Sequence, residues 1–287
     1  MNPKFLRIFT TITILLFISC SHFSGKVQLN EEEKSLYTSV HRSLKSFEGI
    51  EQAKETYVLL YRNWEYSGFW NDLESWKMSQ ELFENICIDY WKIPKSNIKL
   101  IEHDRAGALE FYLKNFKGKR LILYFVSHQS SKKQIILNNG AEYPTRRFAS
   151  LLNKLKAKTL LIFDTCHAEA LKPMLANKNI SVFYASPESK EAYDFRPRGQ
   201  KPTLNEMSEK TRKFIKAAWG VNVKSVSPFG FFVVKALLED SYEGFKLNSL
   251  MALVRSYNRR MTKITGLGRY PGLSWDDRAG WGGLVLR

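Results

Sequence analysis

Cysteine is scarce in this chain of 287 residues, which contains Cys20, Cys87, Cys166 and no others. Cys20 directly follows an N-terminal leader, and the two remaining cysteines are too few for a disulfide-rich scaffold. Cys87 stands between two isoleucines in a helical pattern, so we expect it to be a small residue of the core. Cys166 is the cysteine that has other chemically reactive residue types beside it.

Acidic residues are also few in comparison with basic residues. The chain has 28 Asp and Glu against 44 Lys and Arg, a net charge of +16. This excess favours anionic surfaces, whether lipid headgroups, nucleic acid or acidic peptides, without choosing among them. The basic residues are spread along the chain and form no recognisable nucleic-acid-binding motif. We therefore predict mostly solvated basic faces and no specific nucleic-acid partner.

The sequence lacks an apolar run long enough to span a bilayer comfortably. The run Phe9–Ile18 is short, follows a positively charged start and ends just before Cys20, which is typical of a secretion signal. Ser19 followed by Cys20 resembles a relaxed lipobox, the motif in which the cysteine becomes lipidated. We predict a signal peptide over residues 1–19, a tether over residues 20–45, and a location in the cell envelope with a lipid on Cys20. The alternative is an uncleaved N-terminal anchor.

After residue 45 the pattern alternates between short apolar runs, typical of buried strands, and helical periodicity. It predicts strands at Tyr57–Tyr61, Ile98–Ile101, Leu121–Val126, Leu160–Phe163 and Ile180–Tyr184, and helices at Asp72–Tyr90, Ala106–Phe116 and Phe148–Leu155. Runs with apolar residues at consecutive positions are buried on both faces, as in a parallel sheet with crossover helices. No internal repeat and no second hydrophobic unit is present, so we predict a single α/β domain over residues 46–287.

The C-terminal third has weaker signals. Residues 196–227 are mostly polar and predict a long loop with one embedded helix, Glu206–Ala218. Phe229–Glu239 and Leu247–Thr262 predict two closing helices. We expect the glycine-rich segment Gly266–Gly283 to be irregular.

Two of the predicted strands end in reactive residues. Leu121–Val126 is followed by Ser127 and His128, and Leu160–Phe163 is followed by a turn that contains Cys166. In open parallel sheets, ligands gather at the carboxyl ends of the strands, so neighbouring strands would bring His128 and Cys166 to the same edge. An imidazole beside a thiol stabilises the thiolate or accepts its proton, and the thiolate attacks a carbonyl carbon. Backbone N–H groups of strand-end turns can then bind the oxyanion.

These motifs resemble those of a known group of peptidases. Tyr124–His128 resembles the strand-plus-histidine motif of caspases, metacaspases and legumains, and Leu161–His167 resembles the strand-Asp-small-Cys-His motif of metacaspases and related bacterial peptidases. Val182–Pro187 resembles the strand that helps to form the primary specificity pocket of legumain-like enzymes, and Gly230–Phe232 resembles a later element of the group. The likeness covers roughly Tyr57–Leu286.

The resemblance implies a caspase-like three-layer α/β/α sandwich with a mostly parallel central sheet. It also implies a cysteine endopeptidase that hydrolyses peptide bonds in peptide or protein substrates and needs no cofactor or metal. Cys166 would be the nucleophile and His128 the general base and acid, with the N–H groups of Gln129 and Cys166 as oxyanion donors. By a looser likeness, the candidates for the specificity pocket are Arg62, Asn71 and Ser186.

The sequence departs from the family pattern at two places. The family usually has glycine directly after the catalytic histidine, where this chain has Gln129, and shortly after the Cys-His pair, where it has Ala168 and Glu169. We expect the Gln129 side chain to stand where substrate backbone would pass. A catalytically inactive relative that binds peptides or a partner protein is therefore an alternative, and a basic lipoprotein that acts in adhesion is a second.

Two neighbours of the motifs have simpler explanations. Asp164 is expected to cap or orient the turn before Cys166 rather than to act as a third catalytic residue. His167 could form a metal site with Cys166 and His128, but no further ligand spacing supports zinc, so we predict no metal.

Overall fold

The computed structural model describes residues 53–66, 73–89 and 91–189, and further short pieces at 213, 216–217, 226–227, 230, 245–246, 274–281 and 285–286. The chain divides into two compact units, Met1–Thr38 and Ser39–Arg287, and everything described belongs to the second. The predicted leader, the tether, Cys20, Asn71 and most of the predicted C-terminal loop and helices lie outside the described residues.

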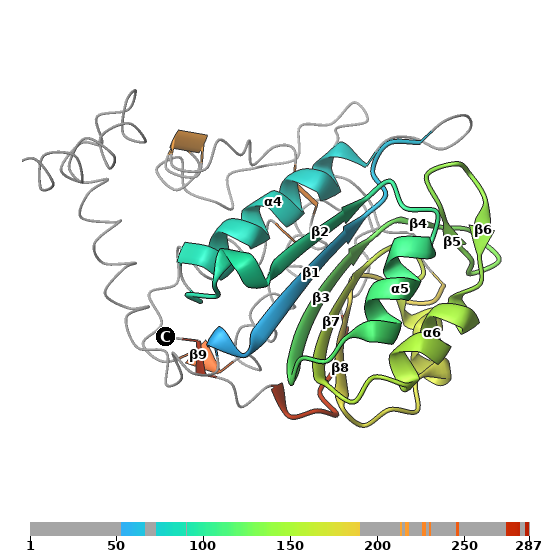
Figure 1. Cartoon of the computed structure of the whole chain (residues 1–287). Coiled ribbons are helices and arrows are strands. Elements are labelled where there is room, and N and C mark those ends of the chain that lie inside the picture. The colour runs from blue at the N-terminus through green and yellow to red at the C-terminus, as the bar shows by residue number, and fades with distance from the viewer. Residues whose placement is uncertain are drawn as a thin grey trace, which may run out of the picture. The chain divides into compact units, whose positions relative to one another are not determined.

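A six-stranded sheet forms the centre of the described part, in the order β10-β8-β7-β3-β1-β2 (Figure 1). Five strands are parallel and β10 is antiparallel to β8. Their bounds are β1 Thr56–Arg62, β2 Ile98–Glu102, β3 Arg120–Val126, β7 Lys158–Asp164, β8 Ile180–Tyr184 and β10 Ser274–Asp276. All five strands predicted from apolar runs are present. The mostly parallel sheet that the sequence predicted is confirmed.

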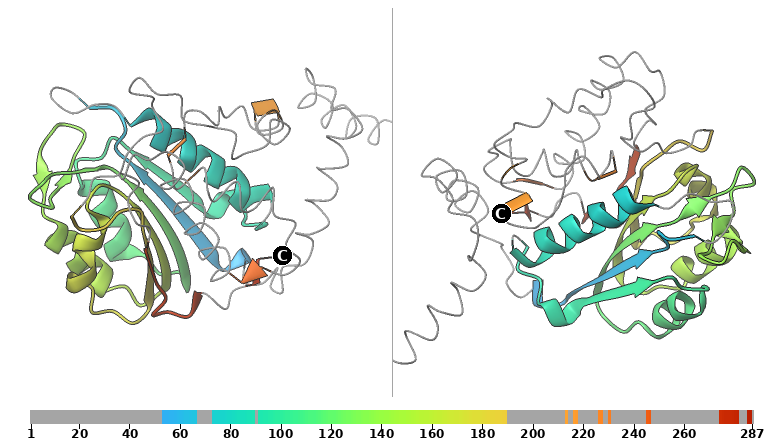
Figure 2. Two further views of the ribbon diagram at one scale, coloured as in Figure 1. Left: turned by 180° about the vertical axis from the view of Figure 1, so that it is seen from behind. Right: turned by 90° about the horizontal axis from the view of Figure 1, so that it is seen from above.

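Helices cover both faces of this sheet (Figures 1 and 2). Helix α4, Glu74–Asp89, lies on one face, and α5, Gly107–Asn115, and α6, Thr145–Asn153, lie on the other. Phe83 of α4 meets Tyr124 edge-to-face, with ring centroids 5.2 Å apart. On the opposite face, Phe148 of α6 packs on the ring of Phe125 at 4.8 Å. The α/β fold with a helical layer on each side of the sheet is therefore confirmed.

The helical layers on both faces of the sheet explain why the strands are apolar at consecutive positions. Residues 121–126 of β3 are buried at every position because alternate side chains point to the two helical layers. Large aromatic rings dominate the α5 and α6 side, where Phe125, Phe148 and Phe163 pack against one another. Truncating one of these rings to alanine is expected to cost about 3–5 kcal/mol of unfolding free energy.

Several short elements were not predicted. A three-stranded antiparallel sheet follows β3, built from β4 His128–Gln129, β5 Ile135–Ile136 and β6 Glu142–Tyr143. The 3-10 helices η1, Lys95–Asn97, and η2, Ala168–Met174, follow α4 and β7, and β9, Phe245–Lys246, pairs with β11, Val285–Leu286.

The expectation that Gly266–Gly283 is irregular is wrong for part of that segment. Strand β10 lies within it and pairs Trp275 with Phe183 of β8. Three residues are too few to show an alternating pattern, and the glycines on either side obscured the strand. Among the helices that the structure describes, none is long and apolar enough to cross a bilayer.

Candidate functional site

His128 and Cys166 lie at matching positions beyond two neighbouring strands. The pairing of β3 with β7 aligns Val126 with Asp164, and each candidate follows its strand by two residues. Neighbouring strands are about 4.8 Å apart. Both residues are half-buried, and Cys166 is a free thiol. The structure therefore brings the two residues to one edge of the sheet, as expected, and a direct contact between the two side chains stays a prediction.

Tyr66 holds His128 in place. The backbone N–H of His128 donates to the Tyr66 hydroxyl at 3.0 Å. The rings of the two residues lie 4.8 Å apart and are tilted by 50°. The Tyr66 hydroxyl in turn donates to the carbonyl of Asn63, just beyond β1, at 2.8 Å. A tyrosine from the neighbouring strand end thus binds the backbone of His128 and packs against its ring, and this tyrosine was not predicted from the sequence.

The backbone after His128 turns sharply into a hairpin. The Ser130 N–H donates to the Gln134 carbonyl at 2.8 Å, and Lys133 has a left-handed backbone with φ of 63°. Hydrogen-bonded and non-hydrogen-bonded pairs alternate along an antiparallel ladder. Gln129, which pairs with Ile135, is therefore a non-hydrogen-bonded position, and its N–H points away from β5.

The Gln129 side chain is turned into the protein. The residue is 3% exposed, and its amide donates to the Lys133 carbonyl at 3.1 Å and to the Thr145 hydroxyl at 3.2 Å. Its amide oxygen accepts a hydrogen bond from Thr165, the residue before Cys166, at 3.1 Å. The expectation that this side chain stands in the path of substrate is wrong, because three hydrogen-bond partners hold it beneath the turn.

The turn that carries Cys166 is fixed from β8. Ser186 is fully buried; its hydroxyl donates to the Thr165 carbonyl at 2.8 Å and accepts the Ala168 N–H at 2.9 Å. The Ser186 carbonyl also accepts the Glu169 N–H at 3.1 Å. Ser186 is thus a support of the nucleophile turn, and its part in a specificity pocket stays a prediction.

Through its ring, His167 has contacts with Lys133 and Glu188. Its backbone is left-handed, with φ of 52°, and its ring is buried. Nδ1 lies 2.7 Å from the Glu188 carbonyl, so it carries a hydrogen and donates to that oxygen, and the Lys133 ammonium lies 3.3 Å from the same atom. Within the part of the chain that is described, no group of three His, Cys, Asp or Glu side chains is placed to hold a metal ion.

Asp164, the last residue of β7, points to the α4 face of the sheet. Its carboxylate accepts hydrogen bonds from Trp76 Nε1 at 2.9 Å, the Tyr124 hydroxyl at 2.9 Å and the Ser227 hydroxyl at 3.0 Å. Burial raises the pKa of Asp164 to about 6, although the three hydrogen bonds act to lower it. The residue therefore links the end of strand β7 to α4 and to Ser227, in keeping with an orienting role.

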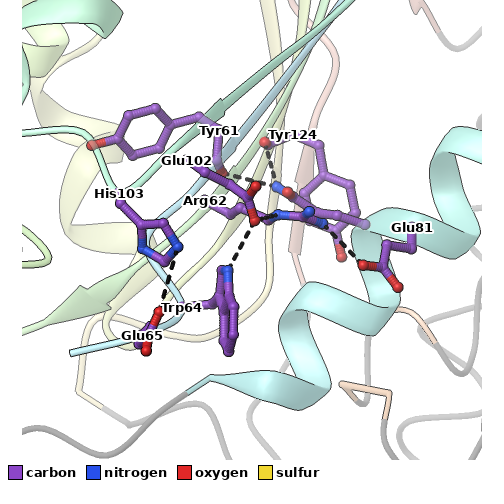
Figure 3. A network of polar contacts seen from close by, with 9 residues as sticks. Tyr61, Arg62, Trp64, Glu65, Glu81, Glu102, His103 and Tyr124 are labelled. Atoms are coloured by element: carbon purple, nitrogen blue, oxygen red, sulfur yellow. Dashed lines mark hydrogen bonds and ion pairs between the residues drawn. The ribbon is translucent and has the colours of Figure 1, made fainter.

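Arg62, at the end of β1, is enclosed by carboxylates (Figure 3). It is 6% exposed; its Nε donates to Glu102 at 2.7 Å, and a terminal nitrogen lies 3.7 Å from Glu81. Trp64 donates to the same Glu102 oxygen at 2.9 Å. Burial acts to raise the pKa of Glu102, but the bonds from Arg62 and Trp64 outweigh it and the pKa falls below its usual value. A specificity role for Arg62 stays a prediction, as does one for Asn71.

Comparison with models of known protein families and with curated proteins gives no match.

Proposed function

We propose that the chain is a cysteine endopeptidase that uses Cys166 and His128. The observation that carries this proposal is the joining of the two strand ends, where Thr165, beside Cys166, bonds the side chain of Gln129, beside His128. The half-buried thiol and imidazole lie at the carboxyl edge, next to the point between β1 and β3 where the strand order reverses. This is where ligands bind in open sheets of this kind.

In the proposed reaction, His128 takes the proton of the Cys166 thiol, and the thiolate attacks the carbonyl carbon of a peptide bond. The oxyanion that forms accepts hydrogen bonds from backbone N–H groups, with Gln129 and Cys166 as donors. His128 then gives its proton to the leaving amine, which departs and leaves a thioester on Cys166. Water attacks the thioester, gives one proton to His128 and releases the carboxylate, and the thiol is restored.

The contacts around the site favour this chemistry because they fix the groups before substrate binds. The Tyr66 hydroxyl and ring orient His128. Ser186 fixes the backbone on both sides of Cys166. The N–H of Gln129 points away from β5, so it remains directed out of the hairpin. Donors that are already oriented need no reorganisation when charge develops, and each contributes about 3–4 kcal/mol to the transition state.

The test is incubation of the purified chain with a mixed peptide library, followed by sequencing of the products. Cleavage should disappear in Cys166→Ala and in His128→Ala and persist in Cys87→Ala. Cys87 is a matched control because it is fully buried in α4 and burial raises the pKa of its thiol. Cleavage that survives Cys166→Ala overturns the proposal.

Absence of cleavage together with peptide binding that survives Cys166→Ala supports instead the inactive binding module. A peptide probe with a thiol-reactive group distinguishes these outcomes, because it labels Cys166 only if the thiolate is available.

A further inference from the structure

The amino-terminal edge of the main sheet carries a row of lysines. Five loops lead into the five parallel strands at this edge, at residues 53–55, 91–97, 116–119, 154–157 and 175–179. They contain a single carboxylate, Glu55, and eight lysines, all exposed: Lys54, Lys92, Lys95, Lys117, Lys119, Lys154, Lys156 and Lys178. We call these eight lysines the basic edge.

The opposite edge has no such excess. The segments that follow the same strands there span residues 63–66, 103–106, 127–144, 165–167 and 185–189, and they hold three bases and four acids. The bases are Arg105, Lys132 and Lys133, and the acids are Glu65, Asp104, Glu142 and Glu188. Among the described loop residues, positive charge is therefore concentrated at the end of the strands opposite His128 and Cys166.

Hydrogen bonds tie neighbouring loops of the basic edge together. The Asn97 side chain, before β2, donates to the Lys54 carbonyl, before β1, at 2.8 Å. The Lys158 N–H, at the start of β7, donates to the Lys119 carbonyl, before β3, at 2.9 Å. Glu55 forms an ion pair with Lys119, whose ammonium lies 2.6 Å away. The lysines thus project from loops that hydrogen bonds tie together, and the one acid of these described loops, Glu55, pairs with Lys119.

We propose that the basic edge binds the anionic headgroup layer of a membrane. Adjacent strands are about 4.8 Å apart, so the loops that carry these lysines lie next to one another and present their charges to the same surface. The cations are all lysines, and the two aromatic residues of these loops, Trp91 and Phe116, are buried and half-buried. Diffuse attraction to lipid suits this arrangement better than binding of single-stranded nucleic acid, which uses exposed rings for stacking.

The predicted lipid supports the same partner. Residues 53–55 lead into β1 at this edge, where the strand begins at Thr56. A lipid on Cys20, as the leader predicts, would bring the domain to a membrane surface. Strand β3 is seven residues long, which places its two ends about 20 Å apart. On a membrane, the edge with His128 and Cys166 would face away from the lipid, toward soluble or extended substrates.

Vesicle binding of the chain without its predicted leader tests this proposal. The chain begins at residue 21, so that neither an acyl chain on Cys20 nor the apolar run Phe9–Ile18 contributes, and binding is compared on phosphatidylcholine vesicles with and without phosphatidylglycerol. The edge variant is Lys117→Gln/Lys154→Gln/Lys178→Gln, and the matched control is Arg105→Gln/Lys132→Gln/Arg146→Gln, which removes the same charge from other exposed positions. Each lysine near an anionic surface contributes on the order of fivefold in partitioning, so the edge variant should bind about 100-fold more weakly.

The control variant should stay within about fivefold of the parent on anionic vesicles, and the parent should bind neutral vesicles weakly. Equal losses in the edge and control variants overturn the proposal, as does equal binding to neutral and anionic vesicles. Loss of duplex DNA binding in the edge variant with vesicle binding unchanged also overturns it and indicates nucleic acid instead.

Lysine acetylation read by mass spectrometry gives a second measurement that needs no variant. Anionic vesicles should protect Lys117, Lys154 and Lys178 and leave Lys132 reactive, and the reverse pattern contradicts the proposed orientation. Neither measurement involves peptide cleavage, so their outcome is independent of the proposed peptidase activity.

Discussion

Thr165 donates a hydrogen bond to the side chain of Gln129 across 3.1 Å, and this bond links the ends of two strands. Gln129 follows His128 and Thr165 precedes Cys166, so one contact fixes the spacing of the two residues on which the proposed chemistry depends. Both partners are buried, and the bond is shielded from solvent. The glutamine at this position is therefore part of the framework of the site.

Replacement of Gln129 by glycine should harm the site. It leaves the buried Thr165 and Thr145 hydroxyls without this partner, which costs about 1–3 kcal/mol of unfolding free energy. We expect a lower urea midpoint and a fall in kcat/KM for peptide cleavage. Gln134→Gly is the control, because the Gln134 side chain bonds only an exposed carbonyl of the same hairpin. A faster Gln129→Gly enzyme would mean that the natural side chain obstructs substrate after all.

The variant Tyr66→Phe tests whether Tyr66 positions His128 for catalysis. The variant keeps the ring that packs on the imidazole and removes the hydroxyl that accepts the His128 N–H. We expect kcat to fall by about 10-fold with KM little changed, because the imidazole loses orientation and the substrate contacts remain. Tyr112→Phe, on the half-buried outer side of α5, should leave kcat unaltered.

Asp164 should make the domain less stable as pH rises through the weakly acidic range. The pKa of Asp164 is about 6 in the folded protein, against 3.8 for an ordinary aspartate. The folded state therefore binds the proton more tightly than the unfolded state does. The stabilisation is present below about pH 4 and is lost by about pH 6, a change of roughly 3 kcal/mol. Urea midpoints measured from pH 4 to pH 7 should show this slope in the natural chain and a shallower one in Asp164→Asn. Identical slopes would show that Asp164 titrates as an exposed aspartate does.

Cys20 should carry a lipid. The positively charged start, the short apolar run and the small residue before the cysteine motivate this expectation. Metabolic labelling with a tagged fatty acid should mark the natural chain and leave Cys20→Ala unlabelled, with Cys87→Ala labelled as a control. Equal labelling of the natural chain and Cys20→Ala would rule out acylation at this position.

The sheet could be predicted because parallel strands covered on both faces are apolar at consecutive positions, as in Leu121–Val126. The small hairpin sheet could not, since β4, β5 and β6 have two residues each and show no periodicity. His128 and Cys166 could be placed because each closes such a run. Tyr66 could not, because its bond to His128 joins residues 62 positions apart and leaves no pattern in the sequence.

The two borders of the sheet differ in how they resist association with other chains. At the β2 border, Lys99 and Glu102 are exposed on a short strand, and charged side chains discourage pairing with another strand. Strand β8 is buried at all five positions, and β10 covers its outer side by pairing Ser274 with Tyr184. During synthesis β8 is therefore complete long before the segment that covers it emerges. A chain truncated before Ser274 would leave the outer side of the apolar strand β8 unpaired, and we expect such a chain to aggregate.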